Sequence, residues 1–350
     1  MEKRILIARW FGPDTAPILI YDEASVSYAR QLVRDAGRRL NLTTEVVEST
    51  AVIASELTHN QLSHAKQGYF AVNPIEKEAA KGLEVIAGDI GPGIQEPDVA
   101  LRDRISAVRG SLGAGLASVS RMADEVEIDN RLAEGVCVVA RKFENEAGPR
   151  GCEIAIMGRP FPGEAISGDD AVFFQSETGL LAAVADGLGH GPEARKASNQ
   201  AIDALNANQE KSLDQIIIAI DAELAKTRGC AMSVMRFNKN DRTIECALAG
   251  DVHAHLYSLR EAQFFASTPL VLGTGQLGRQ KLHIERTTAG PHSVLVMFTD
   301  GLKSRTTLKG QLDVLRQPAI VIAQHLLEND SRPDDDALVL VARFQRSFSN

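Results

Sequence analysis

Aspartates stand beside the ends of apolar, strand-like runs in the second half of the chain, and this pattern constrains the fold most. The apolar runs cover residues 180–185, 294–298 and 337–342. Carboxylates at close quarters repel, and a buried unpaired charge is costly. Hard divalent cations with oxygen ligands remove that cost, and two of them can activate a water and clamp a phosphoryl group. The pattern predicts one shared site for four segments: Gly168-Asp169, Asp186-Gly187, Asp300-Gly301 and Asp335-Asp336.

The order of these four segments resembles that of the PPM-type metal-dependent serine/threonine phosphatases, and within them the bacterial SpoIIE/RsbX-like branch. The resemblance covers roughly residues 150–345 and includes the connecting segments 228–231 and 249–252. A single Asp-Gly pair is only a turn signal, but the four segments in this order are specific. The resemblance implies an α-β-β-α sandwich and phosphatase activity.

The same resemblance implies roles for the acidic residues at a centre of two metal ions. It makes Asp186 the bridging ligand and the Gly187 carbonyl a further ligand. Asp300 and Asp335 would each complete one metal sphere, while Asp169 would bind through water or fix a ligand, and Asp336 would support them from nearby. Mn²⁺ or Mg²⁺ suits an all-oxygen set, whereas Zn²⁺ normally recruits His or Cys.

Composition argues against several other classes of protein. The net charge is −8, from 46 acidic and 38 Lys or Arg residues, and no basic cluster with interleaved aromatics is evident, so we expect no nucleic-acid partner. The four cysteines lie in apolar contexts without metal-ligand spacing, which favours reduced core residues. No signal peptide and no spanning apolar segment is evident, so we expect no membrane partner and a cytoplasmic location.

The length of 350 residues predicts two domains. The one polar break containing Gly and Pro near the middle is residues 144–151, which we take as a linker between domains at 1–143 and 152–346. Both domains are expected to be of the α/β class, with a helical layer over a mixed sheet in the first and two sheets packed face to face in the second. Strands are expected at 4–8, 18–21, 68–72, 83–90, 126–128, 136–142 and 152–157, and helices at 23–40, 44–66, 113–124, 192–206, 212–228 and 318–327.

Three motifs in the first half point to a nucleotide. Glu56 and Asn60 are spaced i,i+4 on an expected helix and so project from one face. An Asn amide oxygen can ligate Mg²⁺, and a carboxylate one turn away can take a proton from a hydroxyl. The segment from Asp89 to Gly93 follows an apolar strand, and a second glycine-rich string at 110–116 precedes a helix. Glycines at a helix start let main-chain N–H groups approach phosphates.

Together these motifs resemble the boxes of the GHKL (Bergerat) ATP-binding fold, in the branch of anti-sigma-factor and stressosome switch kinases. The resemblance covers residues 1–143 and implies that this half binds ATP with Mg²⁺. Asp89 would accept the adenine amino group, Asn60 would hold Mg²⁺, and Glu56 would be the kinase base. Gly91, Gly93, Gly113 and Gly115 would form the glycine boxes. Two departures from the family are Gly135-Val136-Cys137 in place of Gly-Thr-Thr, and three arginines in the lid segment 98–109.

Several alternatives remain open at this point. Without the glycine boxes, Glu56 and Asn60 would be a solvated helix face, and Asp170 and Asp334 are neighbours of the expected ligands. The histidines at 59, 64, 190, 253 and 255 are expected to pack, cap or lie in loops.

The resemblance implies a phosphorylated STAS-domain protein as substrate, an anti-sigma antagonist or a stressosome component. The first half would be a kinase for that same protein or only an ATP sensor, and the non-enzymatic rival is a partner-switching scaffold.

Overall fold

The chain divides into two units, one running to residue 154 and the other spanning residues 155–346. The computed structural model describes residues 9–11, 15–77, 80–94, 116, 118–119, 121–144, 152–176, 178–258, 260–277, 280 and 282–344. Apart from Glu144, the expected linker at 144–151 lies outside these described residues, as do the expected strand at 4–8, the lid segment 98–109, and Gly113 and Gly115.

The first unit contains a sheet with the strand order β1-β2-β3-β5-β4. Its strands are β1 (Ile18–Ile20), β2 (Gln67–Lys77), β3 (Ala80–Ile90), β4 (Glu125–Arg131) and β5 (Gly135–Phe143). The expected mixed sheet is wrong for the described strands, because each neighbouring pair is antiparallel. Short connections account for two of these pairs, β2 with β3 and β4 with β5, since parallel neighbours need a long crossover.

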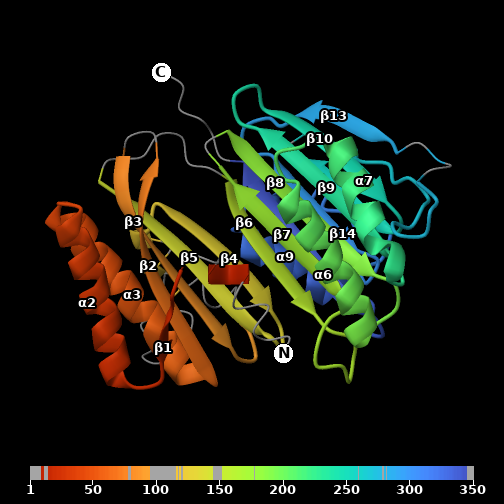
Figure 1. Ribbon diagram of the computed structural model, residues 1–350. Coiled ribbons are helices and arrows are strands. Elements are labelled where there is room, and N and C mark those ends of the chain that lie inside the picture. The colour runs from red at the N-terminus through yellow and green to blue at the C-terminus, as the bar shows by residue number, and fades with distance from the viewer. Residues whose placement is uncertain are drawn as a thin grey trace. The chain divides into compact units, whose positions relative to one another are not determined.

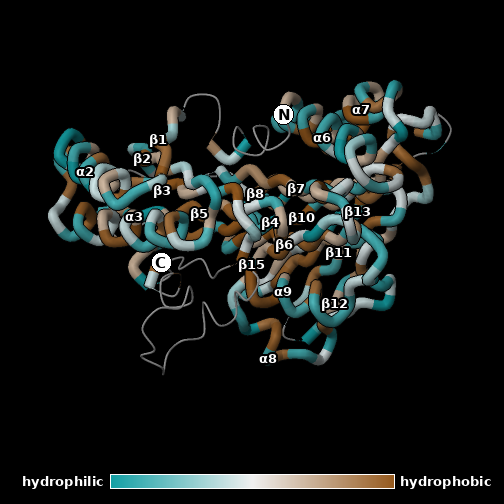
Figure 2. Tube along the Cα trace, turned by 90° about the horizontal axis from the view of Figure 1, so that it is seen from below, coloured by the Kyte–Doolittle hydropathy of each residue, from teal (hydrophilic) through white to brown (hydrophobic). Residues whose placement is uncertain are grey.

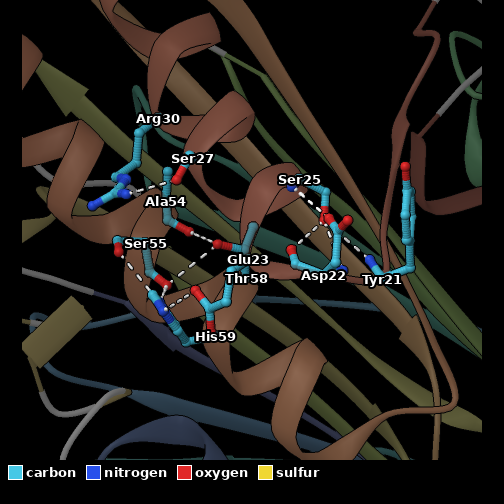
Figure 3. A network of polar contacts seen from close by, with 10 residues as sticks. All are labelled: Tyr21, Asp22, Glu23, Ser25, Ser27, Arg30, Ala54, Ser55, Thr58 and His59. Atoms are coloured by element: carbon cyan, nitrogen blue, oxygen red, sulfur yellow. Dashed lines mark hydrogen bonds and ion pairs between the residues drawn. The ribbon is translucent and has the colours of Figure 1, made fainter.

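Two helices, α2 (Glu23–Arg39) and α3 (Thr44–His64), cover one face of this sheet (Figure 1). Helix α2 begins at a capping box, in which Asp22 Oδ1 accepts from the Ser25 main-chain N–H at 2.7 Å and Ser25 Oγ accepts from that of Asp22 at 3.1 Å (Figure 3). Helix α3 buries Ile53 and Leu57 completely or nearly so. Both helices confirm the expectations for residues 23–40 and 44–66.

Strand β2 extends five residues beyond the predicted end at residue 72, because Pro74 does not interrupt it. On one side β2 pairs with β3 over its whole length, while on the other side β1 reaches only Phe70. Pro74 therefore lies where one edge of β2 has no described neighbour, and such an edge tolerates a missing N–H. The low strand propensity of proline therefore predicted too short a strand here.

The second unit contains two sheets that pack face to face, and the neighbouring strands among β7 to β15 whose register is known pair antiparallel. One has the strand order β6-β15-β14-β11-β12 and the other β13-β10-β9-β8-β7. The strands are β6 (Cys152–Arg159), β7 (Asp169–Gln175), β8 (Gly179–Gly187), β9 (Cys230–Asn238), β10 (Thr243–Ala249), β11 (Val252–Tyr257), β12 (Ala262–Phe264), β13 (Ile284–Thr288), β14 (Val294–Thr299) and β15 (Ala337–Phe344).

Helices form the outer layers of this second unit. Helices α6 (Gly191–Ala207) and α7 (Leu213–Glu223) pack on the sheet that contains β8, and α9 (Ala319–Asp330) packs on β15 next to the short α8 (Leu312–Leu315). Figure 2 shows the hydrophobic character of β15, which is buried on both faces. The arrangement confirms the α-β-β-α sandwich.

The helix expected at 212–228 is shorter in the structure. Helix α7 ends at Glu223, and the chain then forms one 3-10 turn, η1 (Leu224–Lys226). The expected helices at 192–206 and 318–327 are confirmed by α6 and α9. Among the described helices, none has the length and apolar character needed to cross a membrane.

Candidate active site and nucleotide pocket

Strand pairing brings the first two predicted acidic residues together. Asp169 at the start of β7 is the direct partner of Asp186 near the end of β8 in the antiparallel register. Asp169 is 2 % exposed, and Asp186 is half-buried. Directly opposed like charges destabilise a sheet, so this pairing requires compensation from elsewhere.

The hydroxyl of Thr299 joins this pair to the other two aspartate segments. Thr299 Oγ1 donates to Asp169 Oδ2 at 2.7 Å, and it accepts from the main-chain N–H of Leu338 at 3.0 Å. Thr299 immediately precedes Asp300, and Leu338 lies just after Asp335-Asp336. A fully buried hydroxyl therefore holds the ends of β7, β14 and β15 together.

The electrostatics of the four segments show that they lie close to one another. Burial raises the pKa of Asp186, and the charges of Asp169, Asp300 and Asp335 raise it further. Burial also raises the pKa of Asp300, with Asp335 and Asp251 adding to the effect. Each carboxylate thus makes its neighbours harder to ionise, which is the behaviour of acids that share one site without a cation.

Two structural details concern the expected metal site, and the first supports a fit to divalent metal ions. Asp336 Oδ1 accepts from the Phe161 main-chain N–H at 2.7 Å, but Asp336 Oδ2 is buried with no hydrogen-bond partner among the described residues. A Cβ at Gly187 would lie 2.0 Å from the Ala194 carbonyl oxygen, so only glycine permits this close approach of the chain to α6.

Within the described residues, no group of three or more His, Cys, Asp or Glu side chains is placed so that it could hold a metal ion. The fit therefore rests on donor chemistry, burial and mutual repulsion.

Two arginines contact the acidic segments, Arg195 through its side chain and Arg332 through its main chain, and the sequence motifs did not reveal them. Arg195 on α6 is 5 % exposed and donates through Nη1 to the main-chain oxygens of Ser167 at 3.2 Å and Asp169 at 3.1 Å. Arg332 donates its main-chain N–H to Gly301 at 2.7 Å, and its charge lowers the pKa values of Asp300 and Asp335. The only signal for Arg195 was a charged residue on an otherwise apolar helix face.

Asp170, His190 and Asp334, which lie beside the expected ligands in the sequence, make other contacts or lie exposed. Asp170 is fully buried, and its Oδ1 accepts from the Ala171 main-chain N–H at 2.8 Å. His190 stacks on Phe161 at a ring-centroid distance of 4.5 Å and pairs with Glu164 at 3.1 Å, while Asp334 is exposed. None of these contacts joins the carboxylate cluster directly.

His253 and His255 pack against aromatic rings, as expected. His253 stacks on Phe298 at 4.9 Å, and burial lowers the pKa of His255 to about 4. All four cysteines are free, and three of them are buried.

The first unit contains a half-open pocket between α3 and the sheet. Its lining includes three of the predicted nucleotide residues, Asn60 on α3, Asp89 near the end of β3, and Gly93 in the turn that follows. Asp89 is 8 % exposed, and burial raises its pKa to about 7, opposed by a hydrogen bond from the Val136 main chain. Gly91 lies in the same turn.

The pocket does not gather every predicted residue. Glu56 is half-buried one helical turn before Asn60 and is not among the lining residues. His59 also turns to other partners, because its Nδ1 contacts the Ser55 carbonyl at 2.8 Å and its Nε2 pairs with Glu23 at 3.3 Å (Figure 3).

Asn130 on β4 holds the turn that closes this pocket. Its Oδ1 accepts from the Ile94 main-chain N–H at 2.8 Å, and its Nδ2 donates to the Ile94 carbonyl at 2.7 Å. Both bonds span 36 residues of sequence, so no local motif could have predicted them.

These two sites define a chain with a GHKL-type ATPase fold and a PPM-type phosphatase sandwich. Residues 21–142 match the histidine kinase-like ATPase domain, and residues 176–345 match the family described as stage II sporulation protein E (SpoIIE). The chain therefore contains a histidine kinase-like ATPase domain in its first half and a SpoIIE-type PPM serine/threonine phosphatase domain in its second.

Individual relatives agree with this division. The serine/threonine-protein kinase RsbT of Bacillus subtilis (strain 168) is 32 % identical over 130 residues, which are 37 % of this chain and 97 % of RsbT. The phosphoserine phosphatase RsbX of the same organism is 28 % identical over 141 residues, which are 40 % of this chain and 69 % of RsbX.

A solved structure also resembles the chain. It was described under the heading "The bacterial stressosome: a modular system that has been adapted to control secondary messenger signaling", and it is 27 % identical with a TM-score of 0.51. The similarity covers 55 % of this chain and 99 % of that one.

Proposed function

We propose that this protein removes phosphate from phosphoserine or phosphothreonine on a small STAS-domain regulator of a bacterial partner-switching pathway, with two Mn²⁺ or Mg²⁺ ions as cofactors. The observation that carries the proposal is the convergence of acids from four strand ends. Thr299 donates a hydrogen bond to Asp169, and the charges of Asp300 and Asp335 raise the pKa of Asp186. The name of RsbX, a phosphoserine phosphatase, supports the substrate class.

In this proposal Asp186, the Gly187 carbonyl, Asp300 and Asp335 hold the metal ions, while Asp169 supports them. When bound, the ions supply an activated water and charge stabilisation for the phosphoryl group. Thr299 keeps Asp169 oriented through its 2.7 Å bond, and Arg195 fixes the main chain that leads into β7. Arg332 places a positive charge beside Asp300 and Asp335, where it can attract a phosphorylated side chain.

We further propose that the first unit binds ATP with Mg²⁺ in the pocket formed by Asn60, Asp89 and Gly93. Asp89 would accept from the adenine amino group, Asn60 would contact the cation, and Gly91, Gly113 and Gly115 would complete the phosphate boxes. The residues that line the pocket and the match to the histidine kinase-like ATPase domain support this assignment.

A second candidate function is phosphorylation of the same STAS protein by the first unit. The similarity to RsbT, a serine/threonine-protein kinase, favours it, as does the placement of Glu56 one helical turn from Asn60. A chain that adds and removes phosphate on one partner would be a bifunctional switch.

The test is phosphate release from a phosphorylated STAS-domain protein of the same organism, with Mn²⁺ and with or without ATP. We expect release by the wild type in Mn²⁺ and none by Asp300→Asn, with binding of the partner retained. Stable partner binding by the wild type without any release in Mn²⁺ or Mg²⁺ would favour the scaffold and rule out the phosphatase proposal.

A further inference from the structure

The side-chain amide of Gln61 has an orientation that its neighbours determine. Gln61 follows Asn60 on α3 and is 3 % exposed. Its Nε2 donates to the main-chain carbonyls of Tyr69 at 2.9 Å and Gly88 at 3.0 Å, one on β2 and the other on β3. A carbonyl only accepts, so the NH₂ group must face the sheet and the oxygen must face elsewhere.

The amide oxygen is left as a buried acceptor beside the pocket. Gln61 Oε1 has no hydrogen-bond partner among the described residues, although Gln61 lines the same pocket as Asp89. A Cβ built on Gly68 would lie 2.8 Å from this oxygen, which places it against the Gly68 main chain. Gly68 is the direct strand partner of Asp89. The Gln61 and Asp89 acceptors therefore stand at the same end of the pocket.

Two acceptors at one end of an apolar pocket favour a particular ligand group. The surrounding walls include Leu57, Ala87 and Val138, which suit a flat, weakly polar ring. An unpaired buried acceptor costs free energy that a ligand N–H group can recover. A 6-amino purine carries two such hydrogens on one nitrogen. A 6-oxo purine instead presents an oxygen that these acceptors would repel.

We propose that Gln61 Oε1 is the second acceptor, beside Asp89, for the exocyclic amino group of the bound base, and that this pair selects adenine over 6-oxo purines. The inference rests on the proposed ATP site and adds the residue that determines base selectivity. It also assigns a role to Gly68, because any side chain there would displace the Gln61 amide.

The experiment compares ATP with inosine 5′-triphosphate, which replaces the 6-amino group by a carbonyl. Dissociation constants for both are measured by calorimetry on the full chain, as wild type and as Gln61→Met, which keeps length but loses the amide. We expect the wild type to prefer ATP and Gln61→Met to reduce that preference by about five- to tenfold. Gln31→Met is the matched control, because Gln31 lies exposed on α2, where its Nε2 donates to Asp35 Oδ1 at 3.0 Å.

Selectivity separates this role from a purely structural one. If Gln61 merely ties α3 to the sheet, Gln61→Met weakens ATP and inosine triphosphate equally, and the inference is overturned while the ATP site stands. If the wild type binds neither nucleotide, the proposed ATP site itself is wrong and the inference is lost with it. Gly68→Ala provides a second route should Gln61→Met not fold, because displacing the amide is expected to reduce the same ratio.

Discussion

Thr299 Oγ1 donates a 2.7 Å hydrogen bond to Asp169 Oδ2 and joins two strand ends that lie 130 residues apart in the sequence. The same hydroxyl accepts from the Leu338 main chain at 3.0 Å. One small side chain thus orients an acid of the proposed metal site and fixes the start of the strand that follows the Asp335-Asp336 pair.

Thr299→Val is expected to lower the free energy of unfolding by about 1–3 kcal/mol, because it leaves a buried carboxylate oxygen and a buried N–H without their shared partner. Urea unfolding monitored by circular dichroism measures the change. Thr288→Val at an exposed position of β13 is the control and should change stability by less than about 0.5 kcal/mol. Equal stability of the two variants would show that the hydroxyl has no structural role.

Asp186→Asn should abolish phosphatase turnover and yet stabilise the metal-free protein. Burial and the neighbouring carboxylates raise the pKa of Asp186, so removing its charge relieves repulsion when no cation is bound. We expect the variant to melt at a higher temperature than the wild type in EDTA, and Mn²⁺ to stabilise the wild type more than the variant. Thermal unfolding with and without Mn²⁺ measures both effects.

Asp334→Asn supplies the matched control, because Asp334 is exposed and precedes the cluster. It should keep the metal response and the turnover of the wild type. Turnover by the wild type in EDTA at its full rate would contradict the two-metal proposal.

ATP affinity should depend on the ionisation of Asp89. Burial raises its pKa to about 7, so the carboxyl is mostly neutral at pH 6 and mostly ionised at pH 8. The carboxylate is the form that only accepts hydrogen bonds, and we therefore expect ATP to bind more tightly at pH 8 than at pH 6. Asp89→Asn should bind weakly at both values, and calorimetry at the two pH values tests this.

The ligand-free protein should show the opposite trend in stability. The folded state keeps a proton on Asp89 up to about pH 7, whereas the unfolded chain releases it near the ordinary value of 3.8. The Asp89 contribution to stability is therefore present below that ordinary value and is lost as the pH rises through about 7. The difference in melting temperature between wild type and Asp89→Asn isolates this contribution, and a difference that does not vary with pH would refute it.

Glu56→Gln distinguishes a kinase from an ATP sensor. A kinase needs a base beside the acceptor hydroxyl, and Glu56 is the carboxylate one helical turn from Asn60. We expect loss of phosphate transfer from radiolabelled ATP to a STAS partner, with ATP binding retained. The assay uses an Asp186→Asn background, so that the phosphatase does not remove the label. No labelling by a chain with intact Glu56 in that background would leave sensing as the role of the first unit.

The local sequence was sufficient to predict helices, strands and turns, which depend on residues close together in the chain. The apolar runs ending at Asp186 and Asp300 predicted strands β8 and β14, and the spacing of Glu56 and Asn60 predicted their common helix. Helical periodicity, strand alternation and Asp-Gly turns are short-range properties, since each depends on a few adjacent residues. The order of the motifs was likewise sufficient to indicate both families.

Tertiary structure alone decided which side chains meet across the sheets. Asn130 holds Ile94 across 36 residues, Gln61 reaches the carbonyls of two strands, and Thr299 reaches Asp169 across 130 residues. The contacts of Asn130 and Thr299 depend on strand register, because a slip of one residue would turn either side chain to the opposite face of its sheet. Register is set by the packing of a whole buried face, so no single motif carries it, and these positioning residues become visible only in the folded protein.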